Sequence, residues 1–116
     1  MEVENLSKRI NHEAGGTTLI IPVYNSANTL HKLHSRIINV LSENDIKYEI
    51  IFINDGSTDN SWGILCELNN HNKKIKTINL SKNYGQHNAL LCGIREARYN
   101  TIVTLDDDLQ NPPEEI

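Results

Sequence analysis

The chain is poor in cysteine and has no long hydrophobic run. Its two cysteines, Cys66 and Cys92, are too few among 116 residues for a fold held together by disulfide bonds. Both lie among apolar neighbours in segments of helical pattern, so we interpret them as buried thiols rather than as a disulfide or a metal-binding pair. No apolar run approaches the roughly 20 residues of a membrane-spanning helix. No basic start followed by an apolar stretch marks a signal peptide.

The sequence also lacks an excess of positive charge. Lysine and arginine number 11 against 15 acidic residues, which gives a formal net charge of −4. A protein that binds nucleic acid needs a basic face for the phosphates, so we expect no nucleic-acid partner. We interpret the short basic run of Lys73, Lys74 and Lys76 as the solvated rim of a strand.

Several ligand-binding motifs are absent. The chain has neither G-x-G-x-x-G, which binds dinucleotides, nor the phosphate-binding loop G-x-x-x-x-G-K-[ST]. A calcium loop beginning at Asp55 would need glycine at position 60 and glutamate at position 66, where this chain has Asn60 and Cys66. The five histidines form no metal-ligand spacing with the cysteines.

Strand and helix patterns alternate after residues 1–16, which are polar and which we expect to form a flexible lead-in. The predicted strands are Thr17–Val23, Tyr48–Ile53, Ile75–Leu80 and Thr101–Leu105, and the predicted helices cover 27–43, 59–70 and 85–99. In the first helix, apolar residues recur on one face at Leu30, Leu33, Ile37, Val40 and Leu41. Ser26 is expected to cap this helix, and Ser57 or Thr58 the second.

This alternation predicts one α/β domain over residues 17–116. Strands that alternate with helices form a parallel sheet covered by helices on both faces. Right-handed crossovers in a doubly wound, Rossmann-like fold favour the strand order 3-2-1-4. The mixed composition of Ile75–Leu80 is typical of an edge strand.

Polar residues follow each predicted strand, at the edge where open α/β sheets bind ligands. Asp106 and Asp108, two positions apart on extended backbone, point to the same side. Two hard oxygen ligands suit Mg²⁺ or Mn²⁺ held jointly with substrate phosphates. The alternative is that Asp106, Asp107 and Asp108 form an acidic turn or helix cap.

Asp55 has a similar pair of interpretations. Asp-Gly after a strand is an ordinary turn signal, but a carboxylate there can also accept hydrogen bonds from the N–H of a base ring. Tyr24 and Asn25, after the first strand, can line the same pocket, and Tyr24 can equally serve in packing.

Four segments in this order resemble the family-2 inverting glycosyltransferases of the GT-A fold. They are IIPVYNSANTL (20–30), YEIIFINDGSTDNSW (48–62), LSKNYGQHNALLCGIREA (80–97) and TLDDDLQNPPEEI (104–116). More narrowly, they are similar to the polyprenyl-phosphate group, which includes dolichol-phosphate mannosyltransferases and bactoprenol glucosyltransferases. Each segment alone is weakly specific, whereas the ordered set is highly specific.

The resemblance implies roles for individual residues. Nucleotide-sugar binding is implied for Pro22, Tyr24, Asn25, Asp55, Lys82, Asp106 and Asp107, and metal binding for Asp106, Asp108 and Gln110. Asp106 and Asp108 are the two acids of the D-x-D motif, and Asp107 is expected to point away from the metal. Lys82 stands where this group frequently has an arginine, and lysine lacks the planar guanidinium group of arginine.

The resemblance also implies an enzyme that transfers sugar from a UDP- or GDP-sugar, with Mg²⁺ or Mn²⁺, to a polyprenyl phosphate or a saccharide. We expect the whole enzyme to work at the cytoplasmic face of the membrane, with any membrane contact made by segments that this sequence lacks. The family's acceptor site and catalytic base follow the D-x-D motif, so we expect a fragment that binds nucleotide without transfer and that can self-associate.

Two rival functions remain at this point. One is a non-catalytic nucleotide-binding or sensing module. The other is a phosphoacceptor receiver domain, which needs acids after the first and third strands, whereas here they follow the second and fourth.

Overall fold

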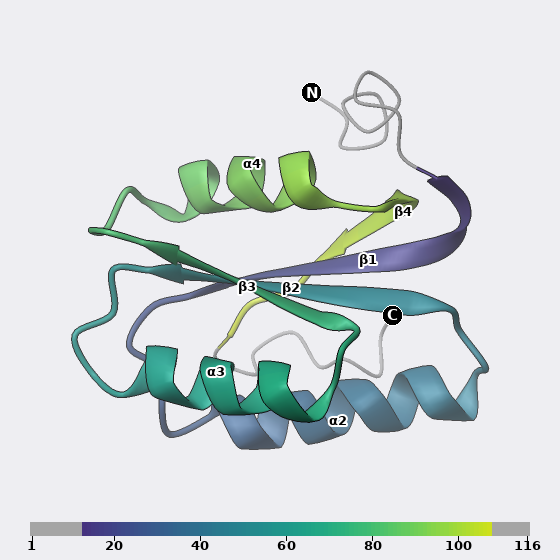
Figure 1. Ribbon diagram of the computed structural model, residues 1–116, viewed down its shortest axis with the longest axis horizontal. Coiled ribbons are helices and arrows are strands. Elements are labelled where there is room, and N and C mark those ends of the chain that lie inside the picture. Colours follow the sequence, from purple (N-terminus) through teal and green to yellow (C-terminus); the bar gives the residue numbers. More distant parts are fainter. Residues whose placement is uncertain (1–12, 108–116) are drawn as a thin grey trace.

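Four parallel strands alternate with three helices in the computed structural model, which describes residues 13–107 (Figure 1). The elements are β1 (Glu13–Val23), α2 (Leu30–Glu43), β2 (Tyr48–Asp55), α3 (Ser61–His71), β3 (Ile75–Leu80), α4 (Gln86–Glu96) and β4 (Tyr99–Thr104). The strand order is β3-β2-β1-β4, and every neighbouring pair is parallel. The predicted fold class, strand order and edge position of β3 are confirmed.

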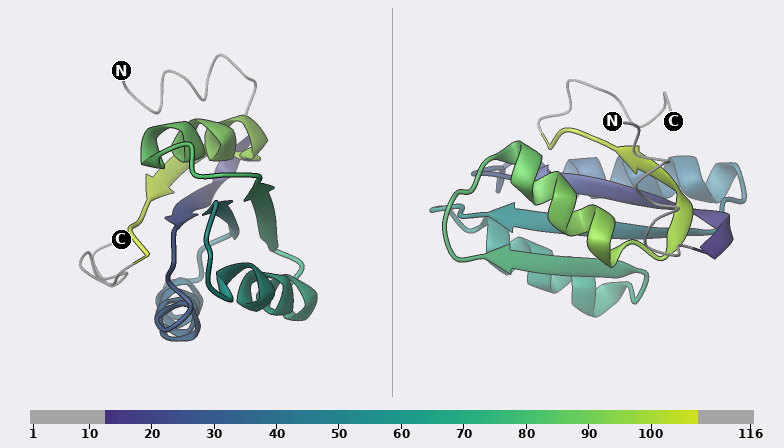
Figure 2. Two further views of the ribbon diagram at one scale, coloured as in Figure 1. Left: turned by 90° about the vertical axis from the view of Figure 1, so that its left-hand side faces the viewer. Right: turned by 90° about the horizontal axis from the view of Figure 1, so that it is seen from above.

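Helices cover both faces of the sheet, as predicted. α2 and α3 lie on one face and α4 on the other (Figures 1 and 2). Alternate residues of the central strand β1 face the two layers: Leu19 and Ile21 pack with α2 and α3, whereas Ile20 packs with α4. Because both faces are covered, β1 and β2 are apolar along most of their length.

The apolar face of α2 is the one predicted from the sequence. Its buried residues are Leu30, Leu33, Ile37, Val40 and Leu41. Burial of each such side chain contributes about 1.5–3 kcal/mol relative to exposure, so this face anchors α2 against the sheet.

α4 approaches the sheet closely at Gly93. A Cβ at this position would lie 2.5 Å from Cγ2 of Ile20 and 3.0 Å from Cδ1 of Ile53. Glycine costs about 1 kcal/mol relative to alanine inside a helix, and the close packing of α4 on β1 and β2 accounts for its presence.

Three predicted boundaries were wrong because pairing between distant segments decides them. β1 begins at Glu13 rather than Thr17, since Glu13 pairs with Tyr99 across an irregularity in register. The predicted helix 85–99 ends at Glu96, because Tyr99 already belongs to β4 and donates its N–H to the hydroxyl of Thr18 at 3.2 Å. β2 extends to Asp55, which pairs with Leu80.

The predicted helix caps were also wrong. α2 begins at Leu30 after Thr29, and the Ser26 hydroxyl donates to the carbonyl of Tyr24 and to Asp107 instead. α3 begins at Ser61 after an Asn60 N-cap that makes no side-chain capping bond. At the start of α3, the Asp59 carboxylate accepts the Ser61 N–H instead.

The cysteines lie in helices on opposite faces of the sheet. Cys66 in α3 and Cys92 in α4 are both free thiols and half-buried. Among the described residues, no helix combines the length and apolar character needed to cross a membrane.

Candidate functional site

A cleft of about 450 Å³ opens at the carboxyl edge of the sheet. It is lined by Pro22, Val23, Tyr24, Asp55, Asn83, Gly85, Gln86, Asp106 and Asp107. These residues lie at or just after the carboxyl ends of β1, β2 and β4, or in the stretch from the β3–α4 loop to the first residue of α4. Three of them are carboxylates, and none is lysine, arginine or histidine. Because like charges repel, such a cleft favours a cation.

Asp55 lines this cleft and holds the β3–α4 loop. Its side chain is only 4% exposed. One carboxylate oxygen accepts the N–H of Tyr84 at 2.7 Å, and the other accepts the N–H of Gly85 at 3.1 Å. Backbone N–H groups therefore stabilise the buried carboxylate without a basic side chain.

Gly56 allows the β2 and β3 loops to meet. Its φ of 72° lies in the left-handed region, which favours glycine. A Cβ here would lie 2.3 Å from the backbone nitrogen of Asn83 and 2.5 Å from the carbonyl carbon of Lys82. The Asp55-Gly56 pair thus makes a turn and a close contact that positions one wall of the cleft.

Asp107 fastens the opposite wall. Its carboxylate accepts the N–H of Tyr24 at 2.9 Å and the hydroxyl of Ser26, while its carbonyl accepts the Thr29 hydroxyl at 2.9 Å. These bonds join segments about 80 residues apart. The Asp107 carboxylate is therefore turned toward the β1–α2 loop.

Asn25 braces a second loop. It adopts a φ of 50°, its N–H donates to the Ser57 hydroxyl at 2.9 Å, and its side-chain oxygen accepts the N–H groups of Thr58 at 2.7 Å and Asp59 at 3.3 Å. Asn25 is not among the residues that line the cleft. Its hydrogen bonds fix the loop after β2 to the loop after β1, which contributes residues to the cleft.

Asp59 accepts further hydrogen bonds within the loop after β2 and from the loop after β1. Its carboxylate accepts the hydroxyl and N–H of Ser61 and the N–H of Ala27, at 2.6, 2.9 and 3.1 Å. These bonds, the Ser61 hydroxyl first, hold the pKa of Asp59 below its usual value.

Asp106 faces the cleft beside Gln86, whose amide donates to the Asp106 carboxylate at 3.3 Å. Among the described residues, no three histidine, cysteine or acidic side chains form a group able to hold a metal ion. The other two predicted metal ligands, Asp108 and Gln110, lie outside the described residues.

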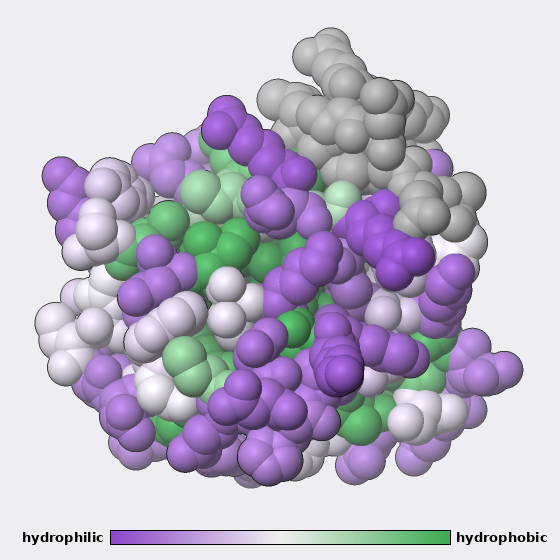
Figure 3. All heavy atoms as spheres, viewed as in Figure 1, coloured by the Kyte–Doolittle hydropathy of each residue, from purple (hydrophilic) through white to green (hydrophobic). Residues whose placement is uncertain are grey.

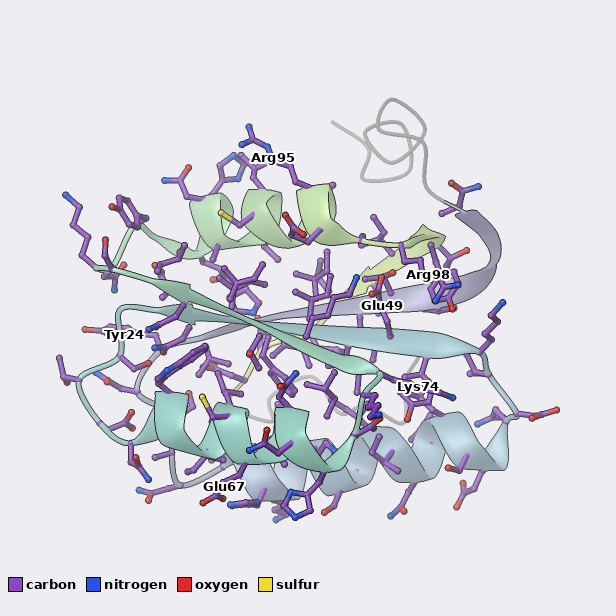
Figure 4. All side chains as sticks on the ribbon, in the orientation of Figure 1. Tyr24, Glu49, Glu67, Lys74, Arg95 and Arg98 are labelled. Atoms are coloured by element: carbon purple, nitrogen blue, oxygen red, sulfur yellow. The ribbon has the colours of Figure 1, made fainter. Side chains whose placement is uncertain are left out.

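The structure brings together most of the predicted nucleotide-sugar residues. Pro22, Tyr24, Asp55, Asp106 and Asp107 all line the cleft, and Figure 4 places Tyr24 at that end of the sheet. Lys82 does not line it; its ammonium lies over the ring of Tyr84, 5.2 Å from the centroid.

Sequence reasoning missed four lining residues: Val23 at the end of β1, and Asn83, Gly85 and Gln86. The last three form a polar, glycine-containing stretch between β3 and the first turn of α4, which marks a ligand-binding loop at this edge of a parallel sheet.

Solved structures share this fold. The mannosyltransferase PcManGT from Pyrobaculum calidifontis, solved with GDP-Man and Mn²⁺, superposes with a TM-score of 0.70 at 20% identity, over 90% of this chain and 34% of that one. S. aureus TarS 1-349 with UDP gives a TM-score of 0.65 at 23% identity, over 80% of this chain and 27% of that one. At such low identity the likeness shows the fold, which is that of the GT-A glycosyltransferases.

The sequence defines the group more narrowly. Residues 18–116 match glycosyl transferase family 2, and the chain belongs to this family. It is 43% identical over 100 residues to the undecaprenyl-phosphate 4-deoxy-4-formamido-L-arabinose transferase of Proteus mirabilis and 42% identical over 97 residues to the uncharacterized glycosyltransferase sll0501 of Synechocystis sp.. These matches cover 85% and 84% of this chain but only 31% and 30% of the relatives, so the chain spans about a third of their length.

Proposed function

We propose that the cleft is the donor site of a glycosyltransferase and binds a UDP- or GDP-sugar together with Mg²⁺ or Mn²⁺. One observation carries this proposal: the described residues that line the cleft include three carboxylates and no basic side chain. A diphosphate placed there without a cation would meet only repulsion from these acids. A divalent cation between acids and diphosphate reverses the sign of that interaction.

The chemistry of the cleft fits such a cation. Mg²⁺ and Mn²⁺ prefer carboxylate and carbonyl oxygens. Asp106 offers a carboxylate in the cleft, held by Gln86 on one oxygen. We assign Asp108 as the second acidic ligand and Gln110 as an additional ligand. When bound, the cation would stabilise the charge of the departing diphosphate.

The remaining residues would receive the nucleotide. Pro22 and Tyr24 would contact the base and ribose, since they form the wall that belongs to β1. Asp55 would set the shape of the β3–α4 loop and present its remaining lone pairs to the base. Asn25 would act through the loop that it braces, and Lys82 would contact the nucleotide only after leaving the ring of Tyr84.

The whole enzyme would transfer one sugar with inversion at the anomeric carbon. A general base would deprotonate the acceptor oxygen as it attacks. The name of the Proteus mirabilis relative supports an undecaprenyl or related polyprenyl phosphate as the acceptor, with a saccharide as the alternative. Such an acceptor would place the reaction at the cytoplasmic face of the membrane. We assign no base within these 116 residues and expect them to bind the donor without transferring sugar.

Calorimetric titration with UDP and GDP, with and without Mn²⁺, tests the donor site. We expect Mn²⁺-dependent binding of one nucleotide that Asp106→Asn abolishes. Asp45→Asn, which removes the same charge from an exposed position far from the cleft, is the matched control and should leave binding unchanged. Equal binding without metal, or in Asp106→Asn, would contradict the proposal.

Transfer is tested separately with the full-length protein, a nucleotide sugar and a polyprenyl phosphate. Sugar transfer by the full-length protein is the expected result. Tight nucleotide binding without transfer or donor hydrolysis would favour a non-catalytic nucleotide-binding module instead.

A further inference from the structure

A second cleft, of about 310 Å³, lies at the opposite edge of the sheet and is strongly basic. It is lined by Lys47, Tyr48, Glu49, Lys73, Lys74, Lys76, Arg98 and Tyr99. Its cations come from the segments that lead into β2, β3 and β4. Five of the chain's 11 lysine and arginine residues therefore surround one cleft, although the chain as a whole is acidic.

The single carboxylate of this cleft does not cancel its charge. Glu49 is only 4% exposed. One of its oxygens lies 2.9 Å from the ammonium of Lys76, and the other accepts the Thr18 hydroxyl at 2.8 Å and the N–H of Arg98. The charge of Glu49 is thus paired with that of Lys76.

Lys47, Lys73 and Lys74 supply positive charge that no carboxylate offsets. Within the part of the chain that the structure describes, none of these three lysines forms an ion pair. All three are exposed. The charges of these three lysines converge on a concavity, and this arrangement creates a positive potential that attracts polyanions.

Tyrosine rings hold three of the cations at the cleft. The ammonium of Lys74 lies 4.8 Å from the centroid of Tyr48, and Lys47 and Arg98 lie 5.6 and 5.4 Å from that of Tyr99. Cation–π contacts favour these positions even without a ligand. The cations are thereby partly ordered before an anion arrives, which lowers the entropy cost of binding.

Figure 4 shows Glu49, Arg98 and Lys74 at one end of the sheet and Tyr24 at the other. In the same orientation, Figure 3 shows hydrophilic residues across the middle and right of the molecule and also at its left and bottom edges. The basic cleft and the acidic donor cleft are therefore separate sites with opposite charge.

We infer that the basic cleft binds a small soluble molecule that carries three or more phosphate groups. Its concave shape and its volume favour a compact ligand over a flat anionic surface. The inference concerns the charge of this cleft alone and does not depend on the proposed donor site.

Titration of the chain with inorganic tripolyphosphate in metal-free buffer tests the inference. We expect saturable binding that the double substitution Lys73→Gln/Lys74→Gln weakens by at least about tenfold, because two of the converging charges are lost. Lys32→Gln/Arg95→Gln is the matched control: it removes the same charge from exposed positions outside the basic cleft and should bind as the unsubstituted chain does. Binding should also weaken as the ionic strength rises toward about 0.15 M.

Absence of binding, or equal loss in both double variants, would overturn the inference. Sedimentation with vesicles that contain anionic phospholipid tests whether the basic cleft binds the phosphate groups of a membrane rather than those of a small soluble molecule. Vesicle binding that needs Lys73 and Lys74 and that tripolyphosphate does not inhibit would assign the surface to a membrane and contradict a small ligand. Since the titration contains no metal, Asp106→Asn should bind tripolyphosphate normally, so the outcome is independent of the donor site.

Discussion

Replacement of Asp55 by asparagine should destabilise the fold strongly, although it changes a single atom of the side chain. Both carboxylate oxygens of Asp55 accept backbone N–H groups of the β3–α4 loop, at 2.7 and 3.1 Å, in a buried position. Asparagine keeps one acceptor but turns an N–H donor toward the second backbone N–H. One charge-assisted bond is lost, and one buried backbone donor remains unsatisfied.

The expected loss follows from these two effects. Hydrogen bonds to charged groups contribute about 1.5–3 kcal/mol, and an unsatisfied buried group costs about 1–3 kcal/mol, with partial relaxation of the exposed loop. We therefore expect Asp55→Asn to lower the free energy of unfolding by about 2–4 kcal/mol, out of a total of roughly 5–15 kcal/mol for a domain of this size.

Urea denaturation followed by Trp62 fluorescence and far-ultraviolet circular dichroism measures this loss. Asp45→Asn is the control, since Asp45 is exposed and has a φ of 51°, a conformation that asparagine tolerates well. A loss of less than about 0.5 kcal/mol in Asp55→Asn relative to Asp45→Asn, within the usual range of surface substitutions, would refute a stabilising role for the Asp55 carboxylate.

Three further substitutions test other parts of the structure. Gly56→Ala should lower the free energy of unfolding by about 2–4 kcal/mol in urea denaturation, because it combines left-handed strain with overlap against backbone atoms of Asn83; unchanged stability would show that the two loops are not in contact. Asp107→Ala should remove hydrogen-exchange protection of the Tyr24 amide, whereas Asp107→Asn, which keeps an acceptor, should retain most of it; equal protection in both variants would exclude the Asp107–Tyr24 bond. Burial, and secondarily the charge of His31, lowers the pKa of His34 below 6.5, so His34 is neutral in both states above that pH. As the pH falls below 6.5 the unfolded chain takes up a proton that the folded chain resists, and stability should fall more in the unsubstituted chain than in His34→Gln; parallel pH profiles would contradict this.

Periodicity within single segments predicted most of the fold. The five apolar positions of α2 and the continuous apolar run of β2 depend on local pattern, and both were found as predicted. The strand order followed from the handedness of crossovers, which is also independent of detailed contacts. Boundaries at Tyr99 and Leu30 were mistaken because partners more than 70 residues away determine them.

The candidate site was predictable in position but not in detail. Acids after β2 and β4 had to meet at one edge of a parallel sheet, and Asp55 and Asp106 do so. Their hydrogen-bond partners were not predictable, because Asp55 binds backbone N–H groups, which every residue other than proline carries. The basic cleft was missed for a related reason: Lys47, Lys73 and Arg98 are far apart in sequence, and only the register of the strands places them together.

Localised paramagnetic broadening by Mn²⁺ tests the central claim most directly, namely that a divalent cation and a nucleotide meet in the acidic cleft. The chain would be studied by nuclear magnetic resonance with UDP or GDP and a substoichiometric amount of Mn²⁺. The account predicts loss of the amide signals of Tyr24 and Gln86, retention of those of Lys74 and Arg98, and no loss in Asp106→Asn. Broadening centred on Lys74 and Arg98, or the same broadening in Asp106→Asn, would contradict it.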